Sequence, residues 1–135
     1  MTLTSFAVAY VAATVVFLVI DAIWLGSVAT KFYFSRLSHV IRKKPNLGVA
    51  ALFYLVYILG IVVFAVEPGV REGSLMLTAA YGALLGFVAY GTYDFTNLAT
   101  IRDWPWIITL VDIIWGTALT MVSAIAGHLA VQWVI

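Results

Sequence analysis

Four long apolar runs, at residues 4–30, 46–66, 74–100 and 105–134, constrain this chain more than any other feature of its sequence. The hydrocarbon core of a bilayer is about 30 Å thick, and a helix of about 20 apolar residues crosses it. Because backbone groups in lipid must bond within their own segment, each run is expected to be an α-helix. The sequence therefore predicts an all-α integral membrane protein, with residues 1–135 forming one membrane domain built as a four-transmembrane-helix bundle.

Composition excludes several other classes of protein. Hydrophobic residues make up 64% of the 135 and charged residues only 10%, more apolar surface than a soluble domain of this length could bury. The net charge is +1 and the basic residues are few and clustered, so no nucleic-acid partner is expected. The absence of cysteine excludes disulfides, thiolate metal sites and cysteine nucleophiles.

The charge distribution predicts the orientation of the helices. The connection at residues 31–45 holds five of the seven basic residues, whereas the connection at 67–73 is net acidic. Cytoplasmic loops carry an excess of Lys and Arg, so we expect the 31–45 loop in the cytoplasm and both termini on the non-cytoplasmic side.

Three aspartates, Asp21, Asp94 and Asp112, each lie inside a different apolar run. An ionisable side chain in a membrane span is costly unless it faces protein or water, so each is a functional candidate. At 1.5 Å per residue, each lies roughly 10–15 Å from the expected cytoplasmic end of its helix. Tyr54 in the second run lies at a similar depth, so all four helices are expected to contribute to one polar layer.

Helical spacing groups further side chains with these acids. Steps of three and four residues place Tyr90, Tyr93, Asp94 and Asn97 on one side of the third helix. Gly82 and Gly86 on this face are expected to pack inside the bundle rather than in a dimer interface. The candidate site comprises Asp21, Trp24, Tyr54, Tyr90, Tyr93, Asp94, Asn97, Asp112 and Trp115.

The chemistry of such a site follows from its charge. Three carboxylates in a low-dielectric layer cannot all stay ionised without a compensating cation, and no basic residue is expected at that depth. Either some of them carry protons or Asp21, Asp94 and Asp112 together hold a hard divalent ion such as Mg²⁺ or Ca²⁺; no other cofactor is expected. The alternative is a hydrogen-bonded network of neutral side chains that only fixes helix register.

A weak internal similarity raises the question of duplication. Residues 21–27 and 94–100 share an aspartate, a leucine, a small residue and a hydroxyl at matching positions. Both segments run outside to inside, as a duplicated helical hairpin would require. Short matches between apolar helices also arise by chance, so the duplication is one of two explanations.

Several of these segments resemble a known family. The stretch from Tyr90 to Thr100 (YGTYDFTNLAT), with Trp104-Pro105, Asp112-Ile-Ile-Trp-Gly116 and Asp21-Ala-Ile-Trp-Leu25, resembles domain-of-unknown-function family 2177 over essentially the whole chain. The resemblance implies a bacterial, multi-pass protein of the inner (cytoplasmic) membrane with four helices and acids on the first, third and fourth. It implies no activity.

Three functional hypotheses follow. The first is a membrane protein with a cytoplasm-facing carboxylate and tyrosine pocket that binds a cation or protons, acting as a small transporter and, with only four spans, as a homodimer. The second is a membrane-embedded enzyme or lipid-binding accessory protein, in which one acid acts on an amphiphilic substrate. The third is a structural subunit of a membrane complex.

Overall fold

The computed structural model describes residues 1–135 and is entirely helical, with four helices long and apolar enough to cross a membrane. The first span is α1 (Leu3–Trp24), the π-helical turn η1 (Leu25–Ala29) and α2 (Thr30–Leu37) in one continuous helix. The second span is α3 (Leu47–Ile61), the π-helical turn η2 (Val62–Val66) and α4 (Glu67–Arg71). The third and fourth are α5 (Leu75–Thr100) and α6 (Trp106–Val134). The predicted all-α fold with four spans is confirmed.

Two helices extend further than their apolar runs. The first ends at Leu37 rather than near residue 30, and the second ends at Arg71 rather than at residue 66. Lys31 is exposed on the first helix, and a long basic side chain can reach the polar boundary without ending its helix. In the second helix η2 precedes Pro68, and its altered hydrogen bonding accommodates a ring that would otherwise clash with the preceding turn.

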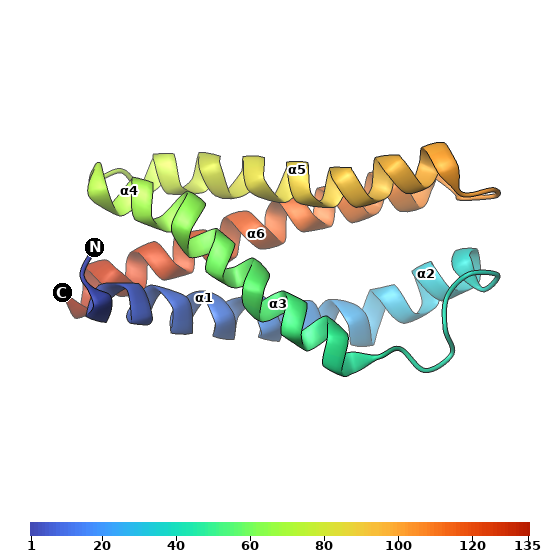
Figure 1. The fold of residues 1–135 in the computed structure, drawn as a ribbon, viewed down its shortest axis with the longest axis horizontal. Helices are drawn as coiled ribbons and strands as arrows, with labels where there is room; N and C mark the ends of the chain where they lie inside the picture. Colours follow the sequence, from blue (N-terminus) through green and yellow to red (C-terminus); the bar gives the residue numbers. More distant parts are fainter.

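The four spans form an elongated antiparallel bundle (Figure 1). Both termini lie at the end that carries α4, and the opposite end carries α2, the loop to α3 and the α5–α6 turn (Figure 1). Helix α6 is central because it packs extensively against both α5 and α1. Helix α3 crosses the bundle obliquely (Figure 1).

Glycines bring α5 and α6 unusually close together. A Cβ atom at Gly86 would lie 2.5 Å from the backbone oxygen of Gly116, and one at Gly82 would lie 3.0 Å from the Cβ of Ala124. Both distances are shorter than ordinary van der Waals contact, so only glycine, which has no side chain, fits at these two positions. The prediction that this glycine pair packs inside the bundle is therefore confirmed.

The distribution of apolar side chains suits a lipid environment. A small core that includes Ala13, Phe17 and Ile61 joins α1, α3 and α6. Large apolar side chains on the outer faces stay exposed, for example Leu52 at 67% and Ile114 at 61%. A bilayer solvates such surfaces, whereas water would not.

Candidate functional site

Asp94 and Asp112 form a carboxylate pair where α5 meets α6. Asp94 is fully buried, with 0% of its surface exposed, and Asp112 is partly buried. The Asp94 and Asp112 side chains line the same cavity. Neither carboxylate oxygen of Asp94 accepts a hydrogen bond from the protein. Asp94 is therefore buried without a donor to its carboxylate, and no basic side chain forms an ion pair with either aspartate.

The backbone around Asp94 is held in place by the start of α6. The Thr109 hydroxyl donates a hydrogen bond of 3.1 Å to the Asp94 backbone oxygen, and the Trp104 indole Nε1 donates one of 3.1 Å to the Thr109 hydroxyl. Trp104 also packs edge-on against Tyr93, with ring centroids 6.1 Å apart. This chain of contacts ties the turn to α5, so the position of Asp94 is fixed while its side-chain oxygens remain free.

Tyr33 of α2 reaches the same pair from the first span. Its hydroxyl donates a hydrogen bond of 3.0 Å to Oδ1 of Asp112. In a regular helix of 3.6 residues per turn, a residue shares a face with the residue eleven positions later. Eleven positions after Asp21 stands Phe32, so a regular helix would place Phe32, not Tyr33, on the face of Asp21. The wider turn η1 lies between Asp21 and Tyr33 and absorbs one additional residue, which rotates Tyr33 onto the side that faces α6.

Asp21 lies in a separate aromatic cluster with Trp115 and Trp24. It is 5% exposed, and its Oδ1 accepts a hydrogen bond of 3.3 Å from the indole Nε1 of Trp115. The Trp115 ring stacks on Trp24, with centroids 4.2 Å apart and planes 10° from parallel. Tyr54 of α3 approaches Asp21, but the second carboxylate oxygen of Asp21 accepts no hydrogen bond.

Two cavities flank Asp112. The first, of about 430 Å³, is lined by both Asp94 and Asp112 and otherwise mainly by apolar residues of η1, α2 and the loop after it. The second, also about 430 Å³, lies between α3 and α5 and is lined mainly by aromatic rings together with Asp112. Asp112 and Tyr93 line both cavities, whereas Asp94 lines only the first.

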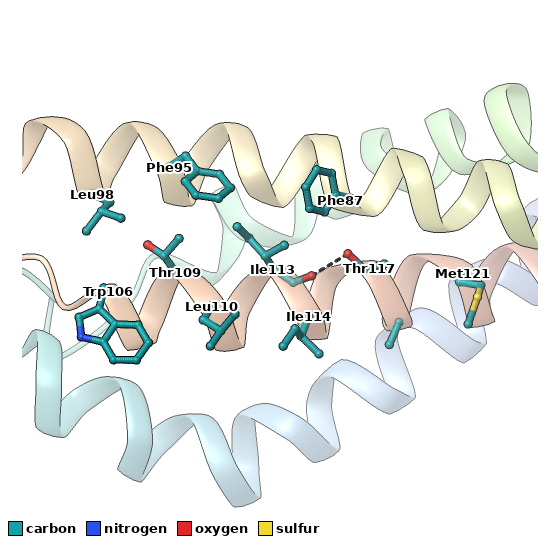
Figure 2. Close-up of a pocket in the computed structure, with 11 residues that line it drawn as sticks. Phe87, Phe95, Leu98, Trp106, Thr109, Leu110, Ile113, Ile114, Thr117 and Met121 are labelled. Carbon is teal, nitrogen blue, oxygen red and sulfur yellow. Dashed lines mark hydrogen bonds between the residues drawn. The ribbon is translucent and has the colours of Figure 1, made fainter.

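A third hollow, of about 690 Å³, has a different character. It lies on an outer face of α5 and α6 (Figure 2). Phe87 and Phe95 extend from α5 beside Ile113 of α6, and the Thr117 hydroxyl donates to the Ile113 backbone oxygen (Figure 2). The second threonine in its lining, Thr109, is also hydrogen-bonded, so this groove offers only apolar contact.

The predicted residues fall into distinct groups. Asp94 and Asp112 line one cavity, Asp21 lies with Trp24 and Trp115, and Tyr54, Tyr90 and Tyr93 line the aromatic cavity. Asn97 is partly buried on α5 but lines neither cavity and forms no hydrogen bond to a carboxylate. No group of three or more His, Cys, Asp or Glu side chains is arranged to hold a metal ion.

Among the aromatic residues at the site, Tyr33, Phe53, Tyr57 and Trp104 were not predicted. The Tyr57 hydroxyl is hydrogen-bonded to that of Thr120 at 2.8 Å and its ring lines the aromatic cavity. Tyr57 lies three residues after Tyr54, one helical step, so spacing could have identified it. Trp104 is consistent with an interfacial anchor by its sequence position, and only the folded turn brings it to Thr109.

Comparison with known proteins identifies a family and nothing more specific. Searches of curated proteins and of solved structures returned no match. A family model described as a predicted membrane protein of domain-of-unknown-function family 2177 matches residues 6–129. The match covers nearly the whole chain and includes all three aspartates, which confirms the resemblance drawn from the sequence. The protein therefore belongs to this family of predicted membrane proteins.

Proposed function

We propose that this chain is a bacterial inner-membrane protein in which the Asp94–Asp112 pair exchanges protons for a cation. The observation that carries the proposal is the Asp94 carboxylate, which is 0% exposed and has no hydrogen-bond partner for either oxygen. A charge buried in this way is strongly unfavourable unless it is paired or neutralised. The ion pairs of the molecule join Arg71 to Glu67 and Glu72, far from the aspartates in sequence, so compensation must come from a proton or a bound cation.

Proton exchange is the direct test. Purified protein in a weakly buffered detergent solution should release protons when Mg²⁺, Na⁺ or an organic cation is added, as a pH indicator would report. Asp94→Asn and Asp112→Asn should each abolish the release. Asp103→Asn is the matched control, because Asp103 is exposed in the α5–α6 turn with φ of 60°, a conformation that asparagine tolerates. Equal release from all three variants and the parent would refute the proposal.

Tyr33→Phe gives a finer test of the same pair. The substitution keeps the ring but removes the donor to Asp112 at 3.0 Å. A hydrogen bond to a charged group is worth about 1.5–3 kcal/mol, so the ionised pair should be less favourable. Proton release should then shift to higher pH, because more of the pair stays protonated at a given pH. An unchanged pH profile would show that Tyr33 does not support the ionised form.

We propose that the site opens toward the cytoplasm and that both termini lie outside. The cavity that contains Asp94 also contacts Ile41, Pro45 and Leu47, residues of the basic connection and the helix start that follows it. Loops rich in Lys and Arg stay in the cytoplasm. In cysteine-free protein, Glu72→Cys should react with a membrane-impermeant thiol reagent in intact cells and Ser38→Cys only after permeabilisation. The reverse labelling pattern would show that the termini lie in the cytoplasm, opposite to this proposal.

The exchange would serve transport across the membrane, and four spans make a homodimer the expected transporting unit. Proteoliposomes with an imposed pH gradient should accumulate a cation only when Asp94 and Asp112 are both present. Native mass spectrometry from detergent should find two copies per particle. Exchange in detergent without transport in liposomes would limit the function to binding.

An amphiphile-binding or membrane-embedded enzymatic role is the second candidate. It is favoured by the cavity next to Asp94, in which ten of the fourteen lining residues are hydrophobic, as an acyl chain would require. Mass spectrometry of lipids that co-purify with the protein would test it. A lipid retained by the parent and lost in Leu25→Trp, which fills this cavity, would support this role, and no such lipid would exclude it.

A further inference from the structure

The cavity between α3 and α5 is an aromatic enclosure with one acidic group. Five rings line it, and its remaining residues are Ala89 and the carboxylate-bearing Asp112. The rings belong to Phe53, Tyr54, Tyr57, Tyr90 and Tyr93. Its volume of about 430 Å³ lies in the range of small-molecule sites.

The packing inside this enclosure is well defined at its inner wall. The Tyr57 and Tyr90 rings meet edge-on with centroids 6.3 Å apart, and the Tyr90 ring lies directly against Gly116, where a Cβ would be 2.1 Å from it. At the outer edge Phe53 and Tyr93 remain 62% and 59% exposed. The inner rings are therefore fixed by the fold, while the outer two keep exposed surface that a ligand can contact.

The lining discriminates between kinds of cation. A divalent metal ion needs six or more oxygen ligands, or several retained waters, to replace its hydration. Asp112 is the one carboxylate in the lining, and the Tyr57 hydroxyl is already bonded to Thr120 at 2.8 Å. An ammonium ion with apolar substituents needs no such ligand set, because aromatic faces attract the positive charge and solvate its hydrocarbon groups.

We infer that the aromatic cavity binds an organic ammonium ion, with its charge directed at Asp112 and its apolar groups against the rings. This inference rests on the proposed function, since it identifies the class of cation that the Asp94–Asp112 pair exchanges for protons. Asp112 lines both cavities, so a cation held by the rings would stabilise the ionised form of the carboxylate that shares a cavity with Asp94.

Binding of benzyltrimethylammonium to the purified full chain tests the inference, with neopentylbenzene as a neutral probe of the same shape. Calorimetry should give at least about tenfold tighter binding of the cation, and Asp112→Asn should weaken its binding by about tenfold or more. Phe53→Leu and Tyr93→Leu should each weaken it about two- to fivefold, the contribution of an exposed cation–π contact. Phe95→Leu is the matched control, because Phe95 is 54% exposed on α5 but lines the outer groove.

The outcomes separate the inference from the proposed function. Equal binding of both probes, or no loss in the Phe53 and Tyr93 variants, would overturn the aromatic site. Proton release by Mg²⁺ that depends on Asp112, without binding of the ammonium ion, would overturn the inference and keep the exchange. Ammonium binding without proton release would keep the aromatic site and refute the exchange.

Discussion

Asp94→Asn is the substitution that best separates a functional carboxylate from an architectural one. Asparagine has the shape of aspartate, and its amide nitrogen could donate to the Asp112 carboxylate beside it. In the native chain both Asp94 oxygens are buried without a donor. A polar group buried in this way costs about 1–3 kcal/mol in protein mutational data. We therefore expect the substitution to raise the free energy of unfolding by about 1–3 kcal/mol while abolishing proton exchange.

The measurement is an unfolding titration with SDS in mixed micelles, analysed as a two-state transition where independent probes coincide. The control is Asp103→Asn, an exposed acid in the α5–α6 turn, which should change the free energy of unfolding by less than about 0.5 kcal/mol. If Asp94 only fixed helix register, its replacement would remove favourable contacts and lower stability. Destabilisation by Asp94→Asn beyond the control would therefore refute the reasoning and favour the structural role.

Two further predictions address the frame around the site. Gly86→Ala should lower the free energy of unfolding by about 1–3 kcal/mol, because the new Cβ would lie 2.5 Å from the backbone oxygen of Gly116. Gly26→Ala is the control in the same titration and should be near neutral, because Gly26 has open space around it. Thr78→Val should lower the free energy of unfolding by about 1–3 kcal/mol, because it removes the 2.6 Å hydrogen bond to Nδ1 of the buried His128. Proton release by this variant should be unchanged. A loss of proton release as large as that of Asp94→Asn would show that this end of the bundle is coupled to the site.

The spans and the acid-bearing positions could be predicted from the sequence because both depend on local properties. Apolar run length fixes the number of helices, and an aspartate within such a run is conspicuous whatever its neighbours do. The spacing of Asp94 and Asp112 from the α5–α6 turn predicts a similar depth for both, and both line one cavity in the structure. The hypothesis of a duplicated hairpin stays a prediction.

The detailed composition of the site depends on features that periodicity does not reveal. Tyr33 bonds Asp112 only because η1 changes the register of the first helix, and the sequence 25–29 carries no pattern that predicts a π turn. Asn97 shares a helical face with Asp94, but Asp94 is fully buried and lines a cavity, whereas Asn97 is partly buried and lines neither cavity. Spacing can identify a face, whereas the packing partner decides which of its residues form the site.

The other buried polar groups of the bundle show what the aspartates lack. At the far end, His128 is fully buried and hydrogen-bonded to Thr78, so these helices can satisfy polar side chains when the role is structural. Four buried side-chain atoms have no partner: the Thr14 hydroxyl oxygen, one oxygen of Asp21 and both oxygens of Asp94. Three of the four are therefore carboxylate oxygens. Neutral hydroxyl or amide pairs would fix register at less cost, whereas an exchangeable proton or cation requires carboxylates whose oxygens stay free.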